Sequence, residues 1–332
     1  MIRLAWRQFR AEAVVGLGAL VVVAVVLAVT GPHLVDVYRT TPSQVTSTDQ
    51  RLQTALFALL LIVPALVGVF FGAPLVAREL EAGTYRLAWT QSVTRVRWLA
   101  VKLAFVGLAS SLLAGGLSLI VAWWGNPINI VNQNRFSPAN FGMFGIVPFG
   151  YALFAFALGA ITGLLFRRTL PAMATTIVGY VAARSAVTFW LRPHFAAPLT
   201  MDFAFNAISF GGFQASGSGL QVVVNNPTIP NAWVLSTAVA NKAGHAPTSA
   251  FLNKACPGVV GGGQRVHAVG RGALLGQMQH CVTAIAAKFH GVATYQPASR
   301  YWPFQIYETA LFVVLALAFA GLSFWWVRRR LT

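Results

Sequence analysis

Six long apolar runs constrain the fold of this chain more than any other feature of its sequence. They span residues 13–30, 54–76, 99–124, 144–166, 170–191 and 304–327. A helix needs about 20 residues to cross about 30 Å of hydrocarbon, so the first run is marginal in length and the others are ample. Only 9% of the residues are charged, whereas soluble domains carry roughly a quarter. The chain is therefore predicted to be an all-α polytopic membrane protein with six transmembrane helices.

Most of the basic residues form short clusters at the ends of these runs. The formal net charge is +17, but no stretch outside the runs combines basic residues with aromatic platforms, so a nucleic-acid partner is disfavoured. One set of loops and ends holds Arg3, Arg7, Arg10, Arg78, Arg86, Arg95, Arg97, Lys102, Arg167, Arg168, Arg328, Arg329 and Arg330. The opposite short loops hold only Arg39, Arg51 and Arg135. Because Lys and Arg are retained on the cytoplasmic side, both termini are predicted to be cytoplasmic.

The segment 192–303 differs in composition from the runs on either side of it. It is rich in Gly, Asn, Ser, Thr and Pro and holds short β-like pieces at 220–224 and 232–239. We expect residues 1–191 to form an N-terminal interfacial helix and transmembrane helices 1–5. Residues 192–303 then form a small mixed, β-containing external domain, and residues 304–332 form the sixth helix and a basic cytoplasmic tail.

The chain has two cysteines, Cys256 and Cys281, and both fall in this predicted external domain. Disulfides persist outside the cytosol, so we expect a Cys256–Cys281 bridge; the alternative is two unpaired thiols. Closing a loop of about 25 residues stabilises a fold by about 3 kcal/mol in the chain-entropy model.

The N-terminal stretch carries two parallel stripes. Ile2, Trp6 and Phe9 recur at helical spacing, and Arg3, Arg7 and Arg10 recur beside them. This phase favours a helix lying in the headgroup plane with its cations toward anionic lipid or an acidic partner. A plain basic flank of the first span explains the arginines equally well. The run that follows lacks a small-x-small cleavage site, so we interpret it as the first span.

The connection after the second run contains a short stretch of mixed charge. Glu79 and Glu81 are two of only seven acidic residues, and they stand in an otherwise basic segment near 78–92. Nothing nearby supplies a metal ligand, a histidine or a nucleophile, which disfavours a catalytic carboxylate pair. Mixed charge on a short helix that ends or bends at Gly83 favours a docking element for a partner protein.

The segment Arg78-Glu79-Leu80-Glu81-Ala82-Gly83-Thr84 resembles the coupling region of type-2 ABC exporter permeases. The order of parts is also similar, with an amphipathic N-terminal helix, six spans and an external segment before the last span. The closing stretch YQPASRYWPFQIYETALF, residues 295–312, is similar to actinobacterial members. The connection of over a hundred residues between spans five and six departs from the family, so no role is carried over to it.

This resemblance implies a membrane-spanning subunit of an ATP-driven exporter, multi-pass in the bacterial plasma membrane. It implies two copies of a separate ABC ATPase that bind ATP and Mg²⁺, and a second permease subunit, identical or related. The substrate class it favours is hydrophobic or amphipathic: a drug, lipid or peptide. The implied coupling residues are Arg78, Glu79, Glu81, Gly83, Thr84 and Arg86. No cofactor is expected in this chain, because its nearest approach to a phosphate loop, residues 258–265, lacks the Lys and the Ser or Thr that touch phosphate and magnesium.

Two charged residues fall within the fifth and sixth apolar runs. Arg184 and Glu308 lie at similar depths from the outer ends of the fifth and sixth runs, so a pair between them is geometrically allowed. Alternatively, the long aliphatic part of the Arg184 side chain could let its guanidinium reach the membrane–water interface. The spacings of His245, His267, His280 and His290 match no standard zinc arrangement, so no metal site is expected.

The rival functions are a sensor or immunity complex whose external domain binds a ligand, and a membrane enzyme acting on lipid.

Overall fold

The chain folds into two compact units. The computed structural model describes residues 2–40, 47–83, 94–126, 135–216, 219–257 and 271–330. One unit, which we call the helical unit, comprises Met1–Phe195 and Ser299–Thr332, and the other, the sheet unit, comprises Ala196–Ala298. The sheet unit is shorter at both ends than the predicted domain 192–303, because residues 192–195 and 299–303 belong to the helical unit.

Within the described residues, the helical unit contains six helices long and apolar enough to cross a membrane. They are α1 (Ile2–Thr40), α2 (Ser47–Leu66) continued by η2 (Val67–Gly72) and α3 (Ala73–Glu81), α5 (Arg95–Trp124), α8 (Val147–Phe166), α9 (Thr169–Ala186) continued by η3 (Val187–Leu191) and η4 (Arg192–His194), and α12 (Tyr301–Arg330). Short helices α7 (Pro138–Phe141) and η5 (Ala298–Arg300) precede α8 and α12. The six predicted spans are confirmed, with the fifth extending past its predicted end at Leu191.

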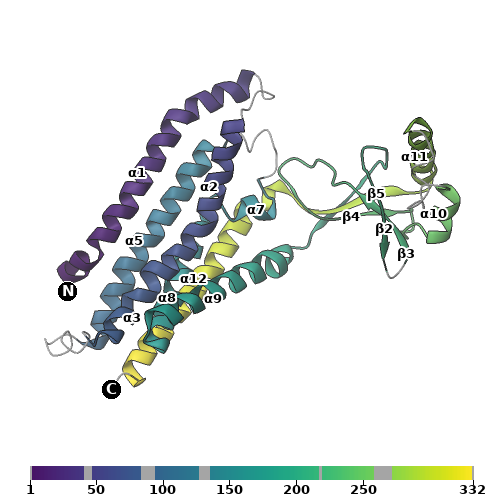
Figure 1. Cartoon of the computed structure of the whole chain (residues 1–332). Coiled ribbons are helices and arrows are strands. Elements are labelled where there is room, and N and C mark those ends of the chain that lie inside the picture. Colours follow the sequence, from purple (N-terminus) through teal and green to yellow (C-terminus); the bar gives the residue numbers. More distant parts are fainter. Residues whose placement is uncertain are drawn as a thin grey trace. The chain divides into compact units, whose positions relative to one another are not determined.

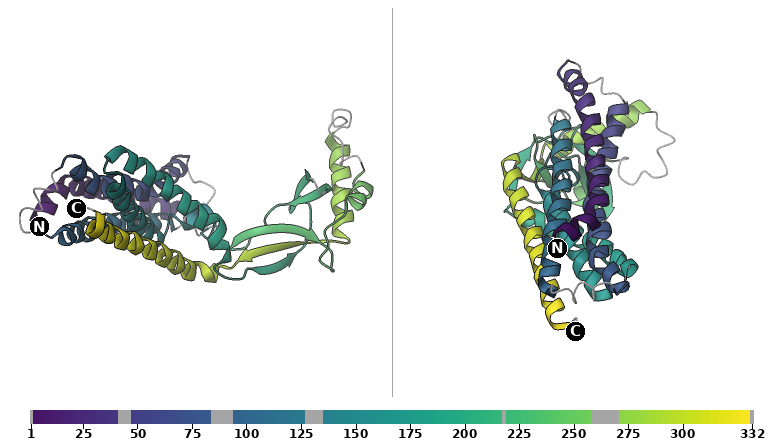
Figure 2. Two further views of the ribbon diagram at one scale, coloured as in Figure 1. Left: turned by 90° about the horizontal axis from the view of Figure 1, so that it is seen from below. Right: turned by 90° about the vertical axis from the view of Figure 1, so that its left-hand side faces the viewer.

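The first span and the N-terminal stretch form one continuous helix. The α1 backbone is helical from Ile2 to Thr40 without a break, so the predicted interfacial helix is not a separate element. For residues 2–13 the structure describes the backbone only. Both termini lie at the end of the helical unit where α3 ends and α5 begins (Figure 1), and α1 runs alongside α5 (Figure 2).

Helix α8 is the central helix of this unit and packs against α12, α5, η2, α3 and α9. Glycines allow the backbones of α8 and the second span to touch. A Cβ on Gly68 would lie 2.6 Å from the Ala155 carbonyl oxygen, and one on Gly163 would lie 2.6 Å from the Ala73 carbonyl oxygen. Such small residues permit close van der Waals packing where lipid supplies no hydrophobic drive between helices.

The second span contains a π-helical segment. Pro64 lies inside α2 and has no N–H to donate, and η2 begins three residues later at Val67. At the end of η2, the Ala73 N–H donates to the Gly68 carbonyl five residues earlier, directly before Pro74, which has no N–H to donate. The span continues as a helix through Pro74 to its end at Glu81.

The sheet unit combines antiparallel strands with two helices. Its elements are β1 (Leu199–Phe203), β2 (Phe210–Ser216), β3 (Gly219–Val224), β4 (Trp233–Ala240), α10 (Ser249–Ala255), α11 (Arg271–Ala286) and β5 (His290–Gln296). Strand order is β1-β5-β4 in one sheet, and β2 and β3 form a two-stranded sheet. Both predicted β-like pieces are strands.

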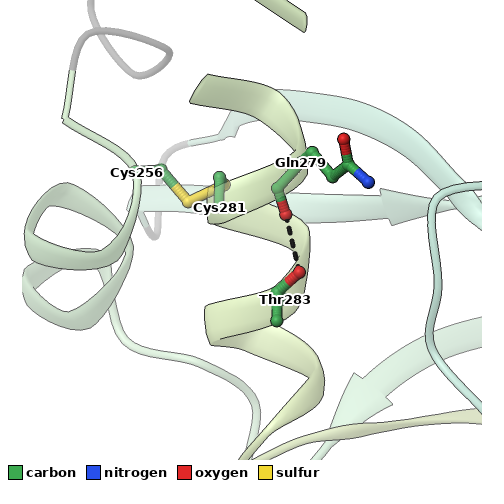
Figure 3. Close-up of a disulfide and its surroundings, with 4 residues drawn as sticks. All are labelled: Cys256, Gln279, Cys281 and Thr283. Carbon is green, nitrogen blue, oxygen red and sulfur yellow. Dashed lines mark hydrogen bonds between the residues drawn. A yellow bond between two sulfur atoms is a disulfide. The ribbon is translucent and has the colours of Figure 1, made fainter. Parts of the chain in front are cut away.

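This unit has its own buried cluster around a disulfide. Phe205, Val224, Val239, Leu252, Val282 and Ile285 pack with both cysteines. The expected bridge is present: Cys256, after α10, is bonded to Cys281 of α11 (Figure 3). The residues 192–303 thus contain a folded unit rather than a long irregular loop.

Candidate functional site

The predicted coupling segment begins at the end of α3. The helix ends where the Ala82 N–H donates to the Arg78 carbonyl at 3.0 Å, and Gly83 follows in the left-handed region with φ of 71°. Gly tolerates this conformation without strain, so Gly83 stops the helix as the sequence indicates. Arg78 is exposed, and Thr84 and Arg86 lie outside the described residues.

Glu79 binds α5 rather than extending freely from the surface. One carboxylate oxygen lies 2.5 Å from Lys102 Nζ, and the other accepts from Trp98 Nε1 at 3.2 Å. Lys102 also donates to the Leu75 carbonyl at 3.4 Å. The side chains of Lys102 and Glu79 are only 8% and 18% exposed. A charge this well buried needs a partner, so this pair fixes the end of α3 against α5.

Glu81, at the end of α3, caps the N-terminus of α9. Its Oε2 accepts from the Thr169 N–H at 3.1 Å and from Thr169 Oγ1 at 2.8 Å. Thr169 is the first residue of α9, and the N-cap residue Arg168 supplies no side-chain cap of its own. A carboxylate at a helix N-terminus satisfies orphan N–H groups and complements the helix dipole. Both acids of the coupling segment are therefore engaged within the chain, one with α5 and one with α9.

The opposite end of the helical unit holds a second buried ion pair. Glu308 of α12 is fully buried, and Arg192 of η4 donates to it from Nε at 2.7 Å and from Nη2 at 2.8 Å. The Tyr151 hydroxyl of α8 donates to the same carboxylate. Arg192 also donates to the Pro138 carbonyl at 3.3 Å. A bidentate arginine with further bonds is the geometry that makes a buried pair tolerable.

The predicted Arg184–Glu308 pair is wrong, because Arg192 takes the place of Arg184. Arg184 donates instead to the Leu61 carbonyl and to the Tyr180 hydroxyl, each at 3.1 Å, and its guanidinium lies 4.6 Å from the Tyr151 ring centroid. The fifth span continues through η3 and η4 to His194. This extension places Arg192 inside the helical unit, whereas the sequence predicts it in the external segment.

Gln305, one turn before Glu308, joins α12 to the turn that leads into α8. Its Oε1 accepts from the N–H groups of Ile146 and Val147 at 3.1 and 3.2 Å. Its Nε2 donates to the carbonyls of Phe141 and Phe144 at 3.0 and 3.1 Å. One buried amide thus bonds four backbone groups in the stretch from the end of α7 to the start of α8, and buried backbone groups need such partners.

Sequence reasoning missed Lys102, Thr169, Arg192 and Gln305. Lys102 was counted only as a charge that sets orientation, although a lone lysine inside an apolar run indicates a buried partner. Among the residues that the structure describes, no group of three or more His, Cys, Asp or Glu could hold a metal ion.

Six apolar helices, one of them the central α8, with ion pairs at both ends of the bundle, define a multi-pass membrane protein. The chain belongs to the family described as ABC-2 membrane transporter related, which matches residues 17–192, more than half of its length. This family makes the chain a membrane-spanning component of an ABC-2 type transporter and implies partnership with an ABC ATPase. The match contains Glu79, Glu81 and Arg192 and ends before Glu308. Comparison with curated proteins and with solved structures gave no match.

Proposed function

We propose that this chain is the permease subunit of an ATP-driven exporter and is energised by a separate ATPase through the end of α3. The observation that supports this most directly is that one short segment is bound to two other spans. Glu79 bonds to Lys102 of α5, and Glu81 caps α9 at Thr169. Displacing that segment therefore displaces three spans.

The orientation follows from charge. The clustered arginines lie where α3 ends, where α5 begins, between α8 and α9, and at the C-terminus. Because such clusters stay in the cytoplasm, the coupling segment and both termini face the cytoplasm of a bacterial cell, where the ATPase is. Arg78 is exposed there, and Thr84 and Arg86 belong to the same proposed contact.

Transport in this proposal uses two permeases, identical or related, on two ATPases. ATP and Mg²⁺ bind to the ATPases, and their closure pushes on residues 78–86 of each permease. The Glu79–Lys102 and Glu81–Thr169 links carry that push to α5 and α9, and the bundle changes between inward-open and outward-open forms. The substrate class is hydrophobic or amphipathic, which agrees with the apolar composition of the spans.

The test is transport by the complex. The full chain is co-expressed with a candidate ABC ATPase from the same organism, purified, and reconstituted in vesicles; a second sample carries a variant of that ATPase that binds but does not hydrolyse ATP. We expect ATP-dependent movement of a lipophilic fluorescent dye only with the active ATPase. Failure of the two chains to co-purify, or equal dye movement in both samples, would refute the proposal.

A matched pair of variants tests the coupling segment. Arg78→Glu reverses an exposed charge at the end of α3, whereas Arg330→Glu reverses one at the C-terminus. We expect the first to reduce ATPase co-purification and the second to leave it unchanged. If both variants co-purify equally with the ATPase, Arg78 is not part of the contact.

The sheet unit supports a second candidate, a sensor or immunity complex. It has its own buried cluster and a disulfide, and it lies outside the family match. ATP hydrolysis by the reconstituted complex without movement of dye, lipid or peptide, together with ligand binding by the full chain, would favour this candidate over the exporter.

A further inference from the structure

An open groove lies between α5 and α12 at the end of the helical unit that carries the arginine clusters. Its volume is about 690 Å³, and Val96 and Ala100 of α5 line one side. The other side is lined by α12 residues Gly321, Phe324, Trp325, Arg328 and Arg329. We call this the α5–α12 groove.

The groove exists because its floor lacks bulky side chains. A Cβ added to Gly321 would meet no atom within 4 Å, and Ala100 opposite is small. Phe324 and Trp325 line the groove three and four residues further along α12, and Trp325 is exposed. The open space is thus a property of the sequence at this level of both helices.

The lining changes from apolar to cationic along the axis of α12. Gly321, Phe324 and Arg328 follow one another at helical spacing, so they lie along one face. The arginines stand within three residues of the end of the candidate span at Arg330. The Arg329 guanidinium lies 5.9 Å from the Trp325 ring centroid, so this cation stays beside another residue that lines the groove. Tryptophan and arginine at a span end lie at headgroup depth.

A lining that is apolar at one end and cationic at the other complements an anionic amphiphile. Guanidinium groups bind phosphate through paired charge-assisted hydrogen bonds, while the apolar part suits a hydrocarbon chain. The described residues that line the groove include no acid, so they offer a cationic ligand no counter-charge. Basic pockets between helices at a membrane face are known to suit anionic lipid headgroups.

We propose that the α5–α12 groove binds one anionic phospholipid, with its phosphate on Arg328 and Arg329 and an acyl chain against Phe324 and Gly321. The groove flanks α5, which carries Lys102, and α12, which carries Glu308. Lipid bound there holds apart two helices that are each tied to a buried ion pair. The inference does not depend on the direction of transport.

The experiment measures lipid retained by the purified full chain. Protein in a mild detergent is titrated with detergent-solubilised phosphatidylglycerol or phosphatidylcholine. The number of lipid molecules bound to each protein is measured by native mass spectrometry. We expect phosphatidylglycerol to bind at least about tenfold more tightly than phosphatidylcholine, because two guanidinium groups favour the anionic headgroup. Inorganic phosphate at equal concentration should not displace it, because phosphate has no chain to fill the apolar part. Equal binding of the two lipids, or displacement by phosphate, overturns the proposal.

Three variants localise the site. Arg328→Gln with Arg329→Gln should lower phosphatidylglycerol binding about tenfold, whereas Arg330→Gln, in the same basic tail but outside the lining, should leave it unchanged. Gly321→Leu fills the floor and should lower binding of both lipids; the open space at Gly321 lets this variant fold, which gel filtration checks.

Wild-type binding by both the double variant and Gly321→Leu overturns the proposal. Equal loss in Arg330→Gln does so too, because it would indicate general attraction to a basic tail. If Gly321→Leu dissociates an oligomer without changing lipid binding, the groove is an interface between protein chains and not a lipid site.

Discussion

Arg192 binds Glu308 through two parallel hydrogen bonds, at 2.7 and 2.8 Å, across 116 residues of sequence. Arg192 stands just before the sheet unit in the chain, and Glu308 stands just after it. Both belong to the helical unit. The pair therefore holds together the two points at which the chain leaves and rejoins the membrane bundle.

Glu308→Gln is expected to destabilise the protein by about 3–5 kcal/mol, because it leaves the Arg192 guanidinium buried without a counter-charge. The measurement is thermal unfolding of the full chain in detergent. Exchanging the charges, Arg192→Glu with Glu308→Arg, should recover part of the loss.

The control exchange is Arg184→Glu with Glu308→Arg, which should recover nothing. Arg184 donates to Leu61 and Tyr180 instead of to Glu308. Equal recovery by both exchanges would contradict the assignment of Arg192 as the partner.

The Glu79–Lys102 pair should behave asymmetrically on mutation. Glu79→Gln alone leaves a buried ammonium and is expected to cost about 3 kcal/mol, whereas Glu79→Leu with Lys102→Met should be close to neutral, because an apolar pair replaces the ion pair. Unfolding midpoints compare the two, with exposed Arg78→Gln as the control. A double variant as unstable as the single would mean that the pair itself stabilises the fold.

Glu81→Gln tests the cap on α9. Loss of the carboxylate weakens the bonds to Thr169 N–H and Oγ1, so backbone amides in the first turn of α9 should exchange hydrogen faster. Global unfolding should change little, because this contact is exposed. Exchange is read by mass spectrometry of peptides from 165–180, with those from α8 as the internal reference; unchanged rates would argue against the cap.

Removing the disulfide should affect the sheet unit selectively. Cys256→Ser with Cys281→Ser is expected to lower its stability by about 3 kcal/mol, since the bridge closes a loop of 25 residues in sequence separation. Protease sensitivity of 196–298 should rise while the spans stay protected. Modification of either thiol by a maleimide without prior reduction would show that the bridge does not form.

Hydropathy predicted the helical unit well because a bilayer demands a fixed length of apolar helix, and residues 54–76 or 304–327 meet that demand visibly. The bridge was predictable because Cys256 and Cys281 are the chain's two cysteines. The partners of charged groups were not predictable. They depend on how helices far apart in sequence meet, and no periodicity in one segment reports that Lys102 faces Glu79.

The error at Arg184 has a specific cause. The apolar run ends at Leu191, and Pro193 follows, so the sequence indicates a span end there. The backbone instead tightens and continues through η4 to His194, which shifts the cation that meets Glu308 by eight positions. Gln305 was missed for a similar reason, since its four backbone partners lie between the end of α7 and the start of α8, a stretch that has no sequence signature.

The clamp formed by Arg192 and Glu308 also makes the insertion between them modular. Among the residues that the structure describes, the bonds that hold the clamp, to Tyr151, Pro138 and each other, all come from the helical unit. We therefore expect the clamp to persist when another folded segment replaces 196–298 and rejoins the same two anchor points.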